Sequence, residues 1–423
     1  MPDAHALLIP SSIGFAHLGR LLLIADALRQ SGHSVAFAYG GPHGDVITAL
    51  GYPWLPIADI TLGERGVFER AVLEHYTPDV IERCMQSELA AFEAFRPQVV
   101  VTDFRPTAPI STALAGVPHL AVLNAYATEA FDAARLLAEP AASPLRYRLT
   151  QQAIHGFVRW QARRFASDLN RAARRFGVSG RRTLYGYLGG EVNLLADLPG
   201  FVPLTRLPRH SFLTGPLIWE GLEQPYPPLP PLRSSQRRVY VTIGNTGSPA
   251  LIDAVVEAFA GRGEYQVIIT TGAYVSPAGG LGENIHAYRF LPGSAVMRQS
   301  DVAIHGGGNG TTYQCLANGL PAVVVPSNND QIIAARLVCW HGVGVPLSLH
   351  GLTAGRLARA VEHVLSRETY RTRAGAWQQR MVGVDGAGAA AQVISAAARA
   401  AAIHPRGWQH SLRGLMEQPH AAV

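Results

Sequence analysis

The sequence has no lysine: all 36 basic residues among its 423 are arginine. Enzymes that form a Schiff base with a lysine, including pyridoxal-phosphate enzymes and aldolases, are therefore excluded, and so are P-loop NTPases. Residues 14–21 imitate the glycine spacing of a P-loop. Arg20 and Leu21, however, stand where that loop needs its Lys and its Mg²⁺-binding hydroxyl.

Paired aspartates and paired cysteines are also missing. No Asp-x-Asp occurs, although such a pair commonly holds Mg²⁺ or Mn²⁺ against a nucleotide-linked substrate. No metal site is predicted, and phosphate chemistry in this chain is expected to need no metal ion. Cys84, Cys315 and Cys339 are odd in number and contain no Cys-x-x-Cys, which predicts reduced thiols and no structural zinc.

Long apolar runs are absent as well. No window of about 18 residues is free of charge and glycine, and residues 1–10 lack the basic segment and cleavage site of a secretion signal. We therefore expect a cytoplasmic protein without stable membrane insertion.

The excess of positive charge does not indicate nucleic acid. The net charge is +6, but the arginines are spread along the chain, so no nucleic-acid partner is predicted. In the one dense run, residues 157–178, apolar residues recur at helical spacing with arginines between them: Phe157, Trp160 or Gln161, Phe165, Leu169, Ala172 and Phe176. We interpret the run as a core-packing helix with a solvated basic face. A surface for a membrane or an acidic ligand is the alternative.

Length and periodicity indicate two α/β domains. A chain of 423 residues with 48% hydrophobic content is long enough for two cores and too long for one. Apolar strands alternate with helical segments from residue 6 and again from residue 237, and the Pro-rich stretch between them has no periodicity. We predict four parts: an N-terminal Rossmann-like domain (1–215), a linker (216–236), a C-terminal Rossmann-like domain (237–395) and a C-terminal helix and tail (396–423).

The most informative stretch is 301–331. An apolar strand (302–304) leads into a turn with four glycines (305–310), and a helix is expected from about Thr311. A helix start that glycines allow a ligand to approach closely is an anion site. Further donors surround it, namely His305, Asn309, Thr311 and Thr312. The pattern predicts a diphosphate ligand, and an ordinary strand-to-helix turn is the alternative.

This stretch resembles the donor-binding segment of the GT-B fold glycosyltransferases of the UDP/dTDP-sugar-dependent, inverting natural-product type, similar to glycosyltransferase family 1. Their pattern is His-x-Gly-x-Asn/Gly-Gly/Ser-x-x-Glu, followed by Gly-x-Pro and then Asp/Glu-Gln. The resemblance implies that the donor diphosphate is bound by His305, Gly307, Gly308, Asn309, Gly310 and Thr311, with Gly244 and Thr246 of a second glycine turn. It implies that Asp330 and Gln331 bind the donor sugar.

The nucleoside-binding positions depart from that family. Its ribose-binding Glu falls on Tyr313, and Gln314 is the possible substitute. Phe290 stands at the aromatic position that stacks on the nucleobase, with Gly293 in place of the family's Gln. A core position for Phe290 is the alternative.

The first loop carries the second part of the resemblance. In the family, a Gly-His lies sixteen residues before the His of the Gly-His that ends the first helix. His17 and His33 have that spacing, with Ala16 in place of the Gly. Arg20 stands where many members have Pro. The resemblance makes His17 the catalytic base and Asp103, at the end of an apolar strand, its orienting partner. An N-cap role for Asp103 is the alternative.

These resemblances imply two Rossmann-like domains that face a central cleft, with a terminal helix that packs back on the first. The implied function is inverting, metal-independent transfer of a sugar from a nucleoside-diphosphate sugar to a hydroxyl of a small natural-product-like acceptor. The enzyme would use no cofactor and act as a monomer or homodimer. A nucleotide-sugar epimerase of the same fold and a non-catalytic sugar-nucleotide-binding partner protein are the alternatives. An NAD site is disfavoured because Thr311 replaces the third glycine of Gly-x-Gly-x-x-Gly.

Overall fold

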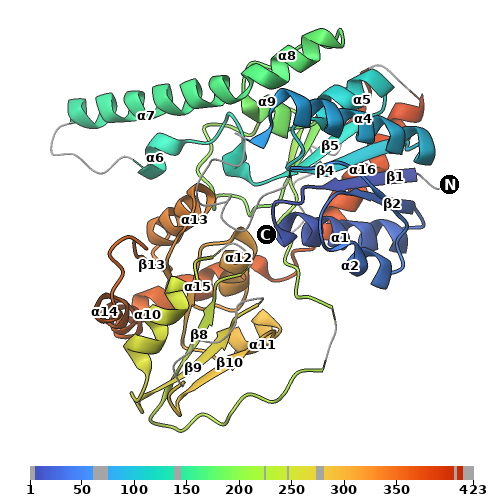
Figure 1. Ribbon diagram of the computed structural model, residues 1–423. Helices are drawn as coiled ribbons and strands as arrows, with labels where there is room; N and C mark the ends of the chain where they lie inside the picture. Colours follow the sequence, from blue (N-terminus) through green and yellow to red (C-terminus); the bar gives the residue numbers. More distant parts are fainter. Residues whose placement is uncertain are drawn as a thin grey trace. The chain divides into compact units, whose positions relative to one another are not determined.

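The structure, a computed structural model, describes residues 5–60, 75–137, 144–222, 225–244, 247–272, 281–403 and 407–412. The chain folds into two compact units. Unit 1 contains Met1–Leu217 and Asp385–Ala422, and unit 2 contains Ile218–Val384. Each unit has a parallel sheet with helices packed on it (Figure 1). The α/β class predicted from the alternation of strands and helices is confirmed.

Unit 1 has a seven-stranded parallel sheet in the order β3-β2-β1-β4-β5-β6-β7. Its strands are β1 (His5–Pro10), β2 (Ser34–Tyr39), β3 (Trp54–Pro56), β4 (Val99–Asp103), β5 (His119–Leu123), β6 (Val192–Leu195) and β7 (Ser211–Leu213). The central strands β1, β4 and β5 are almost continuously buried because helices cover both faces of the sheet.

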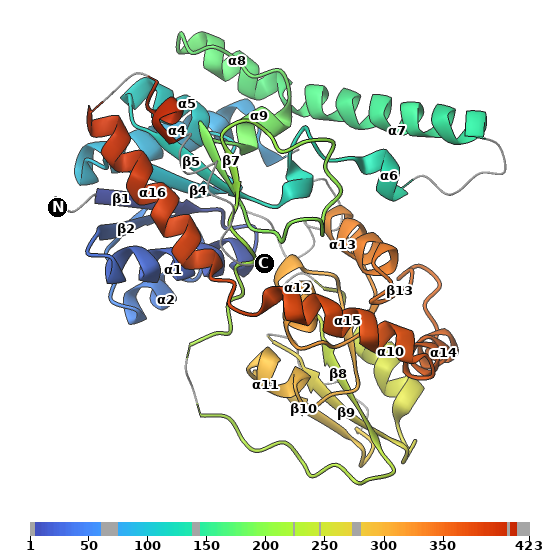
Figure 2. The ribbon, with the colours of Figure 1, turned by 180° about the vertical axis from the view of Figure 1, so that it is seen from behind.

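Unit 1 has nine helices and two short turns in its described residues. They are α1 (Phe15–Gln30), α2 (Gly44–Ala49), α4 (Pro78–Phe95), α5 (Ala108–Ala115), α6 (Ala133–Leu137), α7 (Pro144–Phe165), α8 (Ser167–Arg175), α9 (Leu184–Leu188) and α16 (Gly386–Ile403), with short 3₁₀ turns η2 (Ala125–Ala127) and η3 (Trp408–Leu412). Helix α4 packs on the face that carries Leu7 and Ile9, while α1 and α16 pack together on the other face (Figure 2).

The chain leaves the centre of this sheet in two directions. From β1 it proceeds to β2 and β3 on one side, and from β4 to β5, β6 and β7 on the other. Pro10, the last residue of β1, lies opposite Asp103, the last residue of β4. Ligands of open α/β sheets bind at such a switch point, beyond the carboxyl ends of the strands. The loop that leads to His17 therefore begins beside Asp103.

Unit 2 repeats this design with six parallel strands in the order β10-β9-β8-β11-β12-β13. The strands are β8 (Arg237–Thr242), β9 (Tyr265–Thr270), β10 (Ile285–Tyr288), β11 (Val302–His305), β12 (Ala322–Val324) and β13 (Gly344–Pro346). The helices are α10 (Ala250–Phe259), α11 (Gly293–Met297), α12 (Asn309–Ala317), α13 (Asn329–Trp340), α14 (Ala354–Leu365) and α15 (Glu368–Met381). The switch point lies between β8 and β11, where Thr242 is paired with His305.

The boundaries of the units differ from the predicted ones. The predicted boundary at residue 395 falls inside α16, whose whole length belongs to unit 1. Its small alanines pack on α1, and the Ser395 hydroxyl lies 2.7 Å from Nε2 of His33. Most of the predicted linker belongs to unit 2, because the guanidinium of Arg238 donates to the Pro230 carbonyl at 2.6 Å.

One stretch of the described residues, Glu368–Ile403, is long and apolar enough to span a membrane by length and composition alone. It consists of two helices, α15 and α16, which are separated at residues 382–385. The apolar face of α16 is buried against α1 and β4 within unit 1.

The prediction that Phe157 and Trp160 pack on the core is wrong. Both lie on α7 with more than half of their side-chain surface exposed, and their rings stack on each other at 6.0 Å. The positions that face the core are Ala162, Ala166 and Leu169. Of the predicted stripe, Leu169 is buried and Ala172 packs against the same cluster, so the stripe faces the core in α8 but not at Phe157 and Trp160 of α7.

Candidate active site

The carboxyl end of β4 brings together two side chains that were predicted to act together. His17 lies in the first turn of α1, and its Nδ1 is 2.7 Å from Oδ1 of Asp103. The Asp103 side chain is 1% exposed and that of His17 is 20% exposed. Because the carboxylate accepts a hydrogen bond from Nδ1, the neutral imidazole keeps its lone pair on Nε2. That nitrogen has the form required of a base.

Arg20 binds the same carboxylate, which the sequence did not lead us to expect. Its Nε donates to Oδ2 of Asp103 at 2.8 Å and its Nη2 to Oδ1 at 2.7 Å. Its third nitrogen, Nη1, donates to the side-chain oxygen of Asn124 at 2.6 Å. Residues three apart on a helix share a face, so the spacing of His17 and Arg20 was the available signal.

Both charged groups are held in their ionised forms. Burial alone would raise the pKa of Asp103, but the charge of Arg20, then that of His17, and the hydrogen bonds from both lower that pKa below its ordinary value. For Arg20, burial acts to lower the pKa, and the nearby Asp103 carboxylate raises it further than burial lowers it. Asp103 is therefore a carboxylate shared by two cation-forming groups.

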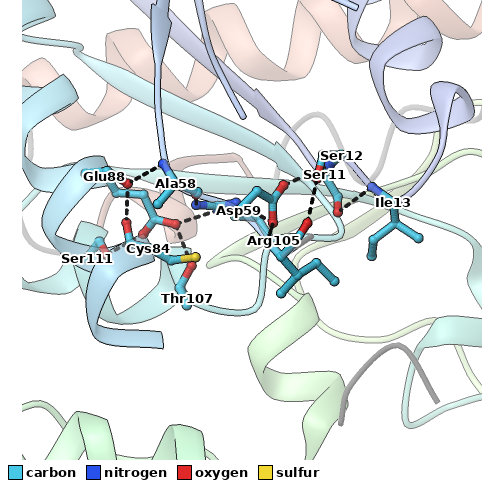
Figure 3. Close-up of polar contacts among 12 residues, drawn as sticks. Ser11, Ser12, Ile13, Ala58, Asp59, Cys84, Glu88, Arg105, Thr107 and Ser111 are labelled. Atoms are coloured by element: carbon cyan, nitrogen blue, oxygen red, sulfur yellow. Dashed lines mark hydrogen bonds and ion pairs between the residues drawn. The ribbon is translucent and has the colours of Figure 1, made fainter. Parts of the chain in front are cut away.

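A buried ion network lies beneath the His17 loop (Figure 3). Arg105, two residues after Asp103, is fully buried between Asp59 at 2.9 Å and Glu88 at 2.6 Å. Asp59 accepts from the backbone N–H of Ser12 at 2.8 Å, and so connects Arg105 to the loop that precedes His17. The network thus couples the position of the loop to that of the segment after Asp103.

Glu88 is the best satisfied member of this network. Besides Arg105, it accepts hydrogen bonds from the hydroxyls of Thr107 and Ser111. The sequence analysis missed Asp59, Glu88 and Arg105, since charged residues scattered along a chain are usually solvated.

In unit 2, His305 ends β11 at the predicted phosphate-binding turn. Its Nδ1 accepts a hydrogen bond of 3.0 Å from the backbone N–H of Gly307, which leaves the proton of the neutral ring on Nε2. The side chain is 1% exposed, and Nε2 has no hydrogen-bond partner among the described residues. Burial lowers the pKa of His305 to about 4. His305 is therefore a neutral donor whose N–H is unsatisfied.

The helix after this turn begins two residues earlier than predicted. Helix α12 starts at Asn309 with Gly308 as its N-cap, and no side chain of the described residues caps it. Within the part of the chain that the structure describes, a Cβ at Gly310 would meet no atom within 4 Å, and a Cβ at Gly308 would meet the Thr311 hydroxyl at 3.9 Å. The described residues thus leave the start of the helix open, as a phosphate site needs.

The second glycine turn lies beside the first. Gly244 follows β8 with a φ of +58°, and a Cβ on Gly306 would come within 3.7 Å of the Cα of Gly247. Thr246, also predicted to bind the diphosphate, lies outside the described residues.

The two residues predicted to bind the donor sugar lie at the start of α13. Asp330 is exposed in its first turn, whereas Gln331 is buried. The amide oxygen of Gln331 accepts from the N–H and the hydroxyl of Ser327, each at 2.8 Å. A Cβ on Gly306 would lie 3.6 Å from the Gln331 amide nitrogen, so this side chain borders the glycine turn.

The predicted nucleoside-binding residues gather near residues 220–221. Phe290 is 44% exposed, so its alternative interpretation as a core residue is wrong. A Cβ on Gly221 would lie 2.5 Å from its ring. The side-chain amide of Gln314 lies close to Gly293, because a Cβ placed on Gly293 would be only 3.1 Å from it. Next to Gly293, the backbone N–H of Ser294 donates to the carboxylate of Glu220. The sequence analysis did not single out Glu220.

Comparisons with known proteins find similar chains. Residues 255–386 match the family described as Erythromycin biosynthesis protein CIII-like, C-terminal domain. A PGL/p-HBAD biosynthesis rhamnosyltransferase of Mycobacterium bovis (strain BCG / Pasteur 1173P2) is 28% identical over 376 residues, which cover 86% of this chain and 81% of that protein.

Solved structures share the fold. The glycotransferase of kitacinnamycin has a TM-score of 0.71 at 22% identity, with 93% of this chain and 99% of that chain covered. Glycosyltransferase VinC, solved in complex with dTDP, has a TM-score of 0.65 at 19% identity, with 93% and 99% covered. The resemblance inferred from the glycine turn and the first loop is confirmed: the chain has the GT-B fold and is similar to glycosyltransferases of the natural-product type.

Proposed function

We propose that this enzyme transfers a sugar from a nucleoside-diphosphate sugar to a hydroxyl of a small-molecule acceptor, with inversion at the anomeric carbon. The observation that carries the proposal is the 2.7 Å contact between Nδ1 of His17 and the buried Asp103 carboxylate. The contact directs the basic Nε2 of a partly exposed imidazole away from the carboxylate. A base so held can take the acceptor proton while the oxygen attacks in line with the leaving group.

The leaving nucleoside diphosphate is stabilised in unit 2. His305 supplies a buried N–H with no partner among the described residues, and the open start of α12 supplies backbone donors and the positive end of its dipole. Preorganised donors of this kind stabilise developing charge without a metal ion. The reaction is therefore proposed to be metal-independent.

The donor class is inferred from the relatives. VinC was solved with dTDP, and the mycobacterial relative is named a rhamnosyltransferase. We infer a UDP- or dTDP-linked hexose or deoxyhexose, with dTDP-rhamnose as the first donor to test. Phe290 would stack on the base, and Asp330 with Gln331 would bind the sugar.

The test is a coupled binding and transfer assay on the full chain. Nucleoside diphosphates are first ranked by calorimetry. The corresponding sugar donors are then incubated with an acceptor panel, and the anomeric configuration of each product is determined by NMR. An inverted glycoside supports the proposal, and a retained configuration contradicts it. Conversion of the nucleotide sugar without any acceptor would favour the epimerase alternative, and binding without turnover would favour a non-catalytic protein.

A further inference from the structure

The Asp103 carboxylate is shared between His17 and Arg20, and this sharing limits how strongly it can support a positive charge on His17. On the basis of the proposed function, we propose that Arg20 restricts this enzyme to acceptors whose hydroxyl is already acidic, namely phenols. Arg20 is then a specificity-determining residue that acts through Asp103.

Arg20 occupies both oxygens of the Asp103 carboxylate, so the imidazole has to share one of them. Arg20 is bidentate, with one donor on each oxygen, and its guanidinium is 10% exposed beside a carboxylate that is 1% exposed. His17 shares Oδ1 with Nη2 of Arg20. Bidentate arginine pairs are the strongest of the charge-assisted hydrogen bonds, so the carboxylate charge is already largely compensated before His17 accepts a proton.

The cation that forms during the reaction also lies against Arg20. Nη2 of Arg20 is 3.5 Å from Nδ1 of His17, whereas Oδ1 of Asp103 is 2.7 Å away. Protonation of His17 therefore places a second positive charge beside the guanidinium, and its repulsion offsets much of the attraction to Asp103. Among the described neighbours of the guanidinium, the Asn124 amide is neutral, and Tyr126 and the Asp197 carboxylate raise the pKa of Arg20 less than Asp103 does.

A base weakened in this way discriminates by acidity. A phenolic hydroxyl, with a pKa of about 10 as in tyrosine, gives up its proton far more readily than an alkyl hydroxyl, which is about as weakly acidic as water. General-base catalysis becomes inefficient as the mismatch between base and acid grows. Phenols therefore remain within reach of His17, and alkyl alcohols do not.

The surroundings of His17 also suit an aromatic acceptor. The ring of Phe104 lies 5.6 Å from that of His17, tilted by 34°. Phe104 has a φ of +54°, a left-handed conformation that is unfavourable for a bulky residue. The fold thus maintains strain at the position that places an aromatic ring beside the base. An offset ring of this kind favours a second aromatic ring as its partner.

The wild-type enzyme supplies the first test. Initial rates are measured with one donor on a series of substituted phenols and on size-matched alcohols, such as phenol against cyclohexanol and 4-methylphenol against 4-methylcyclohexanol. We expect kcat/KM for phenols to exceed that for their matched alcohols by about 100-fold or more, as for loss of effective base catalysis. Equal rates that still depend on His17 overturn this inference alone. Absence of transfer to both classes overturns it together with the proposed function.

The second test uses Arg20→Met, with Arg20→Lys as the matched variant that keeps the charge. Removing the guanidinium leaves Asp103 to His17 and removes the repulsion, so the acid limb of the kcat/KM profile should move to higher pH by about one unit. The preference for phenols over alcohols should fall about tenfold with it. Arg20→Lys keeps the positive charge but not the two-pronged contact, so its acid limb should move less than that of Arg20→Met. A limb that stays or moves to lower pH in Arg20→Met overturns the inference, because a purely structural loss would lower rates without an upward shift.

Discussion

The backbone N–H of Gly307 donates to Nδ1 of His305, and this single bond decides which nitrogen of the imidazole faces a ligand. With Nδ1 as the acceptor, Nε2 carries the hydrogen, and that N–H is buried without a partner among the described residues. An unsatisfied buried donor at a helix start is the condition under which a phosphate oxygen is bound most favourably.

We therefore predict that His305→Ala weakens binding of the nucleoside diphosphate by about 1.5–3 kcal/mol, the usual contribution of a hydrogen bond to a charged group. Calorimetric titration measures the loss directly. His350→Ala, which removes an exposed histidine of the same unit, is the control and should bind as wild type. Equal affinities for the three proteins would remove His305 from the diphosphate site.

The same burial makes the stability of unit 2 depend on pH. The pKa of His305 is lowered to about 4 in the folded chain, whereas an exposed histidine titrates near 6.5. The unfolded chain therefore binds more protons between these values, and stability rises with pH across that window. It is lost as pH falls from about 6.5 to about 4, at up to roughly 1.4 kcal/mol per pH unit.

His305→Gln should flatten this part of the dependence. Scanning calorimetry at pH 4.5 to 7 measures it, with the unit 2 transition identified as the one that added nucleotide raises. His119 of unit 1, whose pKa burial lowers to about 3, serves as the comparison, since its contribution should persist in the variant. A slope unchanged by His305→Gln contradicts the burial effect.

The sequence was sufficient for the features that depend on local pattern. Buried parallel strands read as apolar runs, so the strand ends at Asp103 and His305 could be placed from the sequence. A glycine turn before a helix could be recognised in the same way. These two patterns were enough to locate both candidate sites. In each sheet the switch point places two strand ends side by side, β1 with β4 in unit 1 and β8 with β11 in unit 2.

Contacts between distant polar residues could not be predicted. Arg105 contacts Asp59 and Glu88, which are 46 and 17 residues away in the sequence, and no local pattern marks any of them as buried. The bidentate contact of Arg20 with Asp103 depends on side-chain conformations across 83 residues. The prediction for Phe157 and Trp160 was wrong for another reason: periodicity identifies an apolar stripe, but it does not show over which part of its length the stripe contacts the core.

Metal removal tests the proposed leaving-group chemistry. Because His305 and the start of α12 can stabilise the departing diphosphate, we predict that EDTA leaves turnover within about twofold of its untreated value. The rate of product formation is compared before and after dialysis against chelator. Loss of activity that Mg²⁺ or Mn²⁺ restores would show that the leaving group needs a metal.

The ion network beneath the His17 loop should contribute to both stability and rate. Glu88→Gln removes one charge from a fully buried set, so we predict a loss of about 3 kcal/mol in the free energy of unfolding. Glu82→Gln on the same helix is the control, because its pair with Arg175 is exposed and should cost at most about 1 kcal/mol. Urea unfolding measures both losses, and similar values for the two variants would contradict the assignment. Turnover should fall in Glu88→Gln alone, since only this change loosens the segment after Asp103.

The pair of His17 and Asp103 offers the most direct test of catalysis against binding. His17→Ala removes the base, so turnover should fall by roughly 10²–10⁴, while donor affinity, which depends on unit 2, should stay within error. Asp103→Asn keeps the shape of the side chain but removes the charge that supports the imidazolium, and should also lower turnover. The double variant should lose little more than His17→Ala, because the two side chains act as one unit. Turnover with one identified acceptor and calorimetric nucleotide binding are measured for all four proteins. If both single variants turn over near the wild-type rate, the 2.7 Å contact between His17 and Asp103 is structural, and the acceptor proton must leave by another route.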